Sequence, residues 1–375
     1  MSGFTSFDHN PRTRIVFGGG SVEGVGELAR EIGIKRALLV TDPGIVSAGH
    51  AERVRESLSK AKVECVLFGS VRENPTTTDV DACLKVAREG GVDGIVGLGG
   101  GSSMDTAKGC NFLLTNGGRM QDYWGVGKAS RPMLPLLAIP TTAGTGSECQ
   151  SFALIADTET HQKMACGDPK TAARIAILDP ALTVSQPLRV AACTGIDALS
   201  HALETAVTKK RNALSLSYSR ESFLLCSENF PRVLKNGSDL DARAGMLLGA
   251  ALAGLAIENS MLGAAHAAAN PLTAHFKIVH GQAVGLMLPS VIRFNAADAE
   301  TAKLYDELAP GLAEKVNELL NLAGMPRSLA ECGANAAAIP QLAAEAAKQW
   351  TASFNPRKAS EKDFVKLYEA AFEPR

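Results

Sequence analysis

One carboxylate and three imidazoles in the second half of the chain have the residue types and spacing of a metal site. Asp197 and His201, in the segment GIDALSHALE, are four residues apart and therefore share one face of a helix. His266 follows, and His280 comes fourteen residues after it. These four groups could complete the inner shell of a divalent cation such as Fe²⁺ or Zn²⁺ and leave a position for a substrate oxygen. Each histidine taken alone would as readily be an ordinary core or surface residue.

A glycine-rich segment in the first half is suited to a phosphate. Residues 98–108 read LGGGSSMDTAK, in which three glycines end an apolar strand and two serines open a helical pattern. Glycines let the backbone approach a pyrophosphate, and a helix N-terminus behind them offers N–H groups and a favourable dipole. The segment is neither the G-x-G-x-x-G fingerprint nor a P-loop. A purely structural turn is therefore an equally good interpretation.

Polar groups follow two other apolar strands. The strand ALLVTD ends in Asp42, whose carboxylate could accept hydrogen bonds from a ribose diol and repel a 2′-phosphate, or could simply cap a turn. Residues 140–148 read PTTAGTGSE, where four hydroxyls suit hydrogen bonding to phosphate or nicotinamide, or form a polar turn. Cys149 and Gln150 come next and are candidate pocket walls by their proximity in sequence.

The elements that must position these groups alternate in the first half of the chain. Short apolar runs predict strands at 14–17, 37–41, 63–68, 94–98, 136–139 and 174–178. Segments 21–32, 51–61 and 78–89 carry apolar residues at three- and four-residue spacing, which predicts surface helices. Strands and helices that alternate in this way indicate a parallel sheet covered on both faces.

The second half is predominantly helical. Long Ala/Leu-rich segments predict helices at 190–207, 213–230, 239–259, 297–308 and 312–323. The pattern changes near Ser185–Leu188, so we expect an α/β dinucleotide-binding domain over 1–185 and an all-helical metal-binding domain over 186–375. The most apolar stretch, 244–257, is shorter than the roughly 20 residues of a membrane-spanning helix and is expected to be a buried helix.

Composition limits the class of protein. The 375 residues carry a formal net charge of -1, which disfavours nucleic acid and acidic membrane surfaces as partners. The N-terminus has no apolar signal region, and the 8 cysteines are scattered without a C-x-x-C pair. We therefore expect small buried thiols in a reducing compartment, and a cytoplasmic protein.

Several long motifs occur in one order along nearly the whole chain. They are VTD at 40–42, ENP at 73–75, GGGSSMDTAK at 99–108, PTTAGTGSE at 140–148, DPALT at 179–183, GIDALSHALE at 195–204 and the segment from His266 to His280-Gly281. In this series the chain resembles the iron-containing (group III) alcohol dehydrogenase family. The resemblance implies an α/β dinucleotide-binding domain, a helical domain in a dehydroquinate synthase-like architecture, an active site in the cleft between them, and a homodimer or larger assembly.

The resemblance also implies a role for individual residues at matching positions. The metal would be bound by Asp197, His201, His266 and His280. NAD rather than NADP would be favoured by Asp42, the pyrophosphate would be cradled by Gly99, Gly100, Gly101, Ser102 and Ser103, and the nicotinamide side would be lined by Thr141, Thr142 and Thr145. Asn74, Lys163 and Leu182 would also approach the cofactor.

One position departs from the family pattern. Many relatives carry a further histidine four residues after the third metal ligand, thought to relay the alcohol proton, and here that position is Asn270. An amide does not titrate near neutral pH, so it can orient a hydroxyl but cannot carry its proton. His275 is a candidate for that task, although a helix-end or surface histidine is the alternative interpretation.

The function expected from these observations is reversible hydride transfer between NAD(H) and a small primary alcohol or its aldehyde, with Fe²⁺ or Zn²⁺ as the metal. Two alternatives remain open. One is a reductase of the maleylacetate type that works without metal, and the other is a non-catalytic nucleotide-binding subunit.

Overall fold

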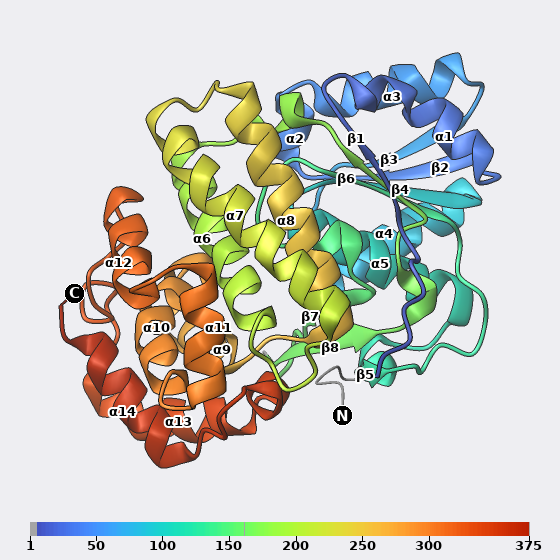
Figure 1. The fold of residues 1–375 in the computed structure, drawn as a ribbon. Helices are drawn as coiled ribbons and strands as arrows, with labels where there is room; N and C mark the ends of the chain where they lie inside the picture. The colour runs from blue at the N-terminus through green and yellow to red at the C-terminus, as the bar shows by residue number, and fades with distance from the viewer. Residues whose placement is uncertain (1–5, 161, 375) are drawn as a thin grey trace. The chain divides into compact units, whose positions relative to one another are not determined.

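The computed structural model describes residues 6–160 and 162–374, which fold into two compact units. The first, here called the sheet unit, comprises residues 10–142 and 146–186. The second, the helical unit, comprises the described residues 6–9, the short segment Ala143–Thr145 and residues 187–374. The α/β and helical composition of the two units confirms the predicted fold class (Figure 1).

The sheet unit is built on six parallel strands in the order β1-β9-β6-β4-β2-β3. The strands are β1 (Arg14–Phe17), β2 (Arg36–Val40), β3 (Glu64–Phe68), β4 (Gly94–Gly99), β6 (Leu136–Pro140) and β9 (Ile175–Leu178). Each of the six predicted strands is present, with its ends within one residue of the expected positions.

Alternate side chains of these strands enter two separate cores, one on each face of the sheet. Leu39 and Val96 pack with the helices α1 (Val25–Glu31) and α3 (His50–Lys60). Leu38 and Ile95, their neighbours in the chain, pack on the other face with α4 (Thr77–Gly90) and α5 (Gly101–Asn116). Successive strand residues point to opposite faces, so a fully apolar strand such as β2 serves both cores.

The strand order places the glycine-rich turn at the topological switch point of the sheet, where successive connections run to opposite sides. β2 lies between β3 and β4, so the chain leaves β2 toward one side of the sheet and leaves β4 toward the other. The short helix α2 (Pro43–Ser47) follows β2, and α5 follows β4. Ligands of open parallel sheets bind beyond the carboxyl ends of the strands at such a switch point. Asp42 and Gly99 lie at these two strand ends.

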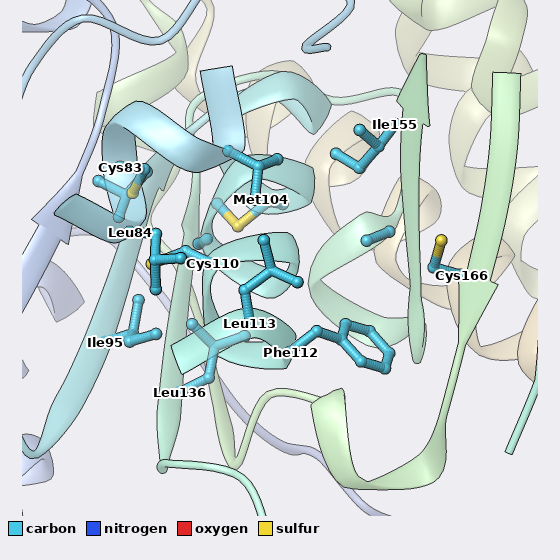
Figure 2. Packing of buried hydrophobic residues seen from close by; sticks show 14 of the residues in the cluster. Cys83, Leu84, Ile95, Met104, Cys110, Phe112, Leu113, Leu136, Ile155 and Cys166 are labelled. Atoms are coloured by element: carbon cyan, nitrogen blue, oxygen red, sulfur yellow. The ribbon is translucent and has the colours of Figure 1, made fainter. Parts of the chain in front are cut away.

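A second, smaller sheet was not predicted. It contains β5 (Gly125–Val126), β7 (Phe152–Ala156) and β8 (Lys163–Gly167), in the order β5-β8-β7. Figure 2 shows α5 side chains such as Met104 and Leu113 between Ile95 of the large sheet and Ile155 of the small one. Buried on both sides, α5 is therefore the central helix of this unit.

A charged cluster is buried between α5 and the turn η3 (Ser147–Cys149). The Lys108 ammonium, which has no exposed surface, donates to the Ser147 carbonyl at 2.6 Å, the Ser147 hydroxyl at 2.9 Å and the Phe152 carbonyl at 2.9 Å. Glu148 is 2% exposed. Burial raises the pKa of Asp105 to about 6 and that of Glu148 to about 7, while Lys108 pulls both downward.

The remaining short 3₁₀ turns of the chain are η1 (Ser21–Gly24), η2 (Met120–Tyr123), η4 (Pro169–Thr171), η5 (Pro180–Thr183), η6 (Ala336–Ala338) and η7 (Trp350–Phe354).

The helical unit is built mainly of α-helices. They are α6 (Leu188–Thr205), α7 (Ala213–Lys235), α8 (Leu240–Ser260), α9 (Ala264–Phe276), α10 (His280–Asn295), α11 (Ala299–Leu308), α12 (Leu312–Leu322), α13 (Ile339–Lys348) and α14 (Glu361–Phe372). All five helices predicted for the second half are present.

Among the residues that the structure describes, one helix is long and apolar enough to cross a membrane, by length and composition alone. It is α8, which contains the apolar stretch 244–257, and 61% of its most apolar window is buried inside the structure. It packs along α7 and against α6. This packing agrees with the expected buried core helix.

The protonation of Glu148 makes stability depend on pH. Because its pKa of about 7 lies above the ordinary value of 4.5, the folded protein keeps a proton that the unfolded chain releases. Stability therefore falls as pH rises through that interval. Between pH 5 and pH 8, the unfolding free energy of the parent should fall by about 1–3 kcal/mol more than that of Glu148→Gln, which has no carboxyl to titrate at this position. Urea denaturation at each pH measures both values.

Glu159→Gln, which removes one exposed carboxyl, is the matched control for the loss of a charge. Parallel pH curves for the parent and Glu148→Gln would contradict a protonated Glu148.

Candidate metal and dinucleotide site

Three histidines from three helices of the helical unit converge on one carboxylate oxygen of Asp197. Asp197 and His201 come from α6, while His266 is the third residue of α9 and His280 is the first residue of α10. The Nε2 atoms of His201 and His266 each lie 3.5 Å from Asp197 Oδ1. The Nε2 atom of His280 lies 3.8 Å from the same oxygen. The structure thus brings together the four ligands expected from the sequence.

These separations fit a shared divalent cation better than direct hydrogen bonds. Two donor atoms about 2.1 Å from one tetrahedral ion lie about 3.4 Å apart, whereas hydrogen-bonded atoms approach more closely. Within the described residues, Asp197 Oδ1 and His266 Nε2 are buried without a hydrogen-bond partner. Buried polar atoms left in this way need a partner, and one carboxylate with imidazoles is a donor set that Fe²⁺ and Zn²⁺ accept.

The electrostatics of the cluster also favour a cation. Asp197 and His201 are 5% exposed, and His266 is 4% exposed. Burial alone would raise the pKa of the Asp197 carboxyl, but the surrounding imidazoles hold that pKa well below its usual range. Burial lowers the pKa of His201, whereas Glu204 and Asp197 outweigh burial and raise the pKa of His266. The site is therefore an anionic carboxylate that already attracts positive charge, and a bound cation would replace the proton on Nε2 of His266.

The hydroxyl-rich segment contributes to the orientation of His201. The Nδ1 atom of His201 lies 3.3 Å from the carbonyl oxygen of Gly144, which belongs to the helical unit. Gly144 can approach because it has no side chain, and a Cβ there would lie 2.5 Å from the Cβ of Thr194 on α6. A carbonyl accepts from the Nδ1–H form of the ring, which leaves Nε2 available as a ligand.

His280 is positioned by an equally close contact. The next residue, Gly281, lies against α6, where an added Cβ would be 2.1 Å from the carbonyl oxygen of Cys193. The first turn of α10 therefore rests directly on the backbone of the helix that carries Asp197.

The two residues considered for proton transfer lie on different faces of α9. Asn270 follows His266 by four residues, on the same face, and its amide donates to Gln349 Oε1 at 3.1 Å. His275 follows His266 by nine residues, about half a turn away in angle and about 13 Å along the axis. Its Nε2 atom pairs with Glu345 on α13 at 2.8 Å. The structure thus keeps Asn270 on the His266 face of α9, one turn further along, and does not bring His275 to the cluster.

Most of the residues expected to bind the dinucleotide gather at the switch point of the sheet unit. Asp42 caps α2 by accepting from the Ile45 amide at 3.1 Å, and its other oxygen would lie 3.2 Å from a Cβ placed on Gly99. Gly99 has a φ of +139°, which side chains rarely adopt. The backbone N–H of Asn74 donates to Ser102 Oγ at 3.2 Å. Asp42 therefore both caps a helix and faces the glycine-rich turn.

The first turn of α5 offers groups for an anion. Gly100, the residue before the helix, has no side chain that could cap it. The backbone N–H groups of Gly101 and Ser102 in the first turn therefore receive no capping bond from Gly100. Among the described residues, Ser103 Oγ is buried without a hydrogen-bond partner. Free donors at the positive end of a 16-residue helix fit a pyrophosphate.

The hydroxyls after β6 divide between the two units. The amide of Thr141 donates to the Gly99 carbonyl at 3.0 Å, and a Cβ on Gly100 would lie 3.3 Å from the methyl group of Thr142. Thr145 belongs to the helical unit. The structure thus joins Thr141 and Thr142 to the glycine-rich turn.

The outlying cofactor candidates have different surroundings. Lys163 begins β8 with an exposed side chain and acts on Asp105 electrostatically. Leu182, in η5, has no exposed surface and packs in the core of the α1/α3 face. Cys149 is 3% exposed, and Gln150 is half-buried.

Sequence reasoning missed Glu204, which contacts His266. Glu204 Oε2 lies 2.5 Å from His266 Nδ1, and the carboxylate is 3% exposed. It comes seven residues after Asp197, so two helical turns place both on one face of α6. That spacing, within GIDALSHALE, is the signal that could have identified it.

The contact at Gly281 can be tested directly. Gly281→Ala inserts a methyl group where no space exists, so the first turn of α10 must move away from α6 and carry His280 with it. We expect a loss of about 1–3 kcal/mol in unfolding free energy and weaker Zn²⁺ binding, measured by denaturation and by competition with a chromogenic chelator. Gly324→Ala, at a glycine with nothing within 4 Å but a φ of +63°, controls for a destabilising change away from the cluster. Unchanged Zn²⁺ affinity in Gly281→Ala would show that this contact does not position His280.

Comparisons with known proteins identify the family of the chain. The family model described as "Iron-containing alcohol dehydrogenase" matches residues 11–180, and the one described as "Fe-containing alcohol dehydrogenase family, C-terminal" matches residues 191–372. The chain is 34% identical to the NAD-dependent methanol dehydrogenase of Bacillus methanolicus, over 95% of this chain and 97% of that protein. It is 36% identical to the choline dehydrogenase of Bacillus subtilis (strain 168), over 96% and 94%.

A solved structure of a 1,3-propanediol oxidoreductase superimposes with a TM-score of 0.94 at 32% identity, covering 98% of this chain and 100% of that one. Both halves of the chain match the family, and the full-length relatives exceed 30% identity. The chain therefore belongs to the iron-containing alcohol dehydrogenase family.

Proposed function

We propose that the protein is an NAD-linked alcohol dehydrogenase that interconverts a small primary alcohol and its aldehyde. The observation that carries this proposal is the convergence of His201, His266 and His280 on one oxygen of Asp197. Relatives named for methanol, choline and 1,3-propanediol support a small alcohol as the substrate class.

The helical unit provides the ligands for the metal, of which Fe²⁺ is the first candidate and Zn²⁺ the second. When bound, the cation supplies a Lewis acid for the alcohol oxygen, and NAD supplies the hydride acceptor. Asp197 contributes the negative charge, and the three histidines contribute neutral donors held by the packing of α6, α9 and α10. Asn270, on the same face of α9 as His266, can orient a hydroxyl but cannot take its proton.

The sheet unit holds the dinucleotide. Asp42 accepts hydrogen bonds from the ribose diol and repels a 2′-phosphate. The amides and hydroxyls from Gly99 to Ser103 bind the pyrophosphate at the N-terminus of α5. Thr141, Thr142 and Thr145 serve the nicotinamide side, while Asn74, Lys163 and the backbone of Leu182 complete the set.

The wider assignments belong to the same proposal. We assign cofactor binding to residues 1–185 and metal binding to residues 186–375. We also propose a cytoplasmic protein without a nucleic-acid or membrane partner, because its formal net charge is -1. From the resemblance to the family we further propose a homodimer or larger homo-oligomer.

Removal of one metal ligand tests the proposal. His201→Ala should abolish bound metal and reduce turnover at least 100-fold, because the remaining donors no longer enclose the ion. Metal content by mass spectrometry and NAD reduction across a panel of small primary alcohols are the measurements. Glu345→Gln, which breaks a histidine–carboxylate pair elsewhere in the helical unit, is the control.

The same experiment separates the alternatives. Full activity in a metal-free His201→Ala protein would favour a metal-independent reductase. NAD binding without turnover on any alcohol or aldehyde would favour a non-catalytic nucleotide-binding subunit.

The choice of dinucleotide tests Asp42. Asp42→Ser removes the carboxylate but keeps a residue that can cap α2. We expect the ratio of kcat/KM for NAD to that for NADP to fall at least 10-fold, because a 2′-phosphate is no longer repelled. Asp42→Asn, which changes only the charge, should lower the ratio in the same direction. An unchanged ratio in both variants would place cofactor choice elsewhere.

A further inference from the structure

Glu204 joins the metal cluster to the start of helix α9. One carboxylate oxygen, Oε1, accepts from the backbone amide of Ala265 at 2.7 Å. The other, Oε2, lies 2.5 Å from Nδ1 of His266. Both contacts are buried, and Glu204 itself is 3% exposed. A single anion from α6 therefore holds two consecutive residues in the first turn of α9.

The first turn of α9 lacks a cap of its own. The residue before it, Gly263, makes no side-chain capping bond. The amide of Ala264 donates instead to Asn355 Oδ1 at 3.1 Å, and that of Ala265 donates to Glu204. An added Cβ on Gly263 would lie 2.9 Å from Asn355 Oδ1 and 3.1 Å from Glu204 Oε1, so glycine is what permits the approach. A carboxylate at a helix N-terminus is also favoured by the helix dipole.

The contact with His266 fixes which ring nitrogen faces the cluster. A carboxylate accepts hydrogen bonds, as Glu204 Oε1 does from Ala265, so the contact with Oε2 favours the ring form of His266 in which Nδ1 carries the proton. The lone pair of the neutral ring is then on Nε2, the atom that lies 3.5 Å from Asp197 Oδ1. Carboxylate–histidine–metal arrangements orient the ring and strengthen it as a donor in this way.

We infer that Glu204 is a positioning residue for the metal site: it selects the His266 tautomer that can bind a divalent cation and holds α9 at the depth that brings Nε2 to Asp197. The inference rests on the proposed function only in taking the cluster to be a metal site.

Glu204→Gln is the informative substitution, because glutamine has nearly the same shape but one acceptor and one donor group. Ala265 N–H and His266 Nδ1–H both need acceptors, so glutamine satisfies one and conflicts with the other. If its amide donates to Nδ1, the His266 proton moves to Nε2 and blocks the ligand position. We expect Zn²⁺ affinity to fall 10–100-fold, the range typical for loss of such outer partners.

The chain offers a matched control in a second histidine–carboxylate pair, whose histidine also lies on α9. His275, near the other end of α9, pairs with Glu345 at 2.8 Å in an exposed position. Glu345→Gln should keep Zn²⁺ affinity within twofold of the parent. The dissociation constants are measured with Zn²⁺ alone, by competition with a chromogenic chelator, after circular dichroism has shown that each variant is folded.

The outcomes separate the two claims. If the parent binds Zn²⁺ and folded Glu204→Gln binds it within twofold, Glu204 serves only as a cap for α9 and the inference is wrong. If the parent binds neither Zn²⁺ nor Fe²⁺, the proposed function fails first and the inference fails with it. Lowered thermal stability without weaker Zn²⁺ binding also indicates a structural cap.

If Glu204→Gln does not fold, the inference is tested on the parent protein instead. Zn²⁺-loaded protein labelled with ¹⁵N at histidine should show a proton on Nδ1 of His266, assigned through the neighbouring Ala265 amide, in a strong hydrogen bond. A His266 ring without a proton on Nδ1 would overturn the inference.

Discussion

The convergence of four donor atoms on one point constrains the whole helical unit. Asp197 and His201 need a single helix, but His266 and His280 arrive from the first turns of two others, so three helices must pack closely enough for their side chains to meet. Small residues make this possible. Gly281 rests on the α6 backbone, and Gly144 brings a carbonyl to His201. An apolar core alone would not select these positions, because no burial of hydrocarbon requires a histidine there.

The sheet unit follows a different constraint, that of the parallel sheet itself. Its strands are apolar on both faces, so polar residues are confined to their ends, and the carboxyl ends of β2 and β4 lie at one edge. Asp42 and Gly99 come together for this reason. The capping bond of Asp42 to Ile45 does not compete with a cofactor role, since a carboxylate has two oxygens and the cap uses one. The structural and functional interpretations of this residue are therefore compatible.

The fold class and the four residues of the candidate metal cluster could be predicted from the sequence, because both predictions rest on local periodicity and on long motifs. The six strands have alternating helices between them, and Asp197 and His201 have helical spacing. The small sheet could not be predicted from the sequence, because β5 has only two residues and β7 and β8 lie in a turn-rich region without a clear alternation of apolar and polar residues. His275 could not be placed without the structure, since only the winding of α9 shows that it faces Glu345 rather than His266. Glu204 and Lys108 were overlooked because an isolated Glu or Lys is ordinarily a surface residue.

The path of the chain through residues 142–146 has a consequence for dissecting the protein. Ala143, Gly144 and Thr145 belong to the helical unit, although the chain on either side of them belongs to the sheet unit. A fragment beginning at residue 187 would lack the carbonyl that receives the His201 ring, and a fragment ending at residue 186 would carry three residues without their native neighbours. The two halves matched by the family descriptions are thus not interchangeable modules. Exchanging the C-terminal half between relatives would also require exchanging this tripeptide.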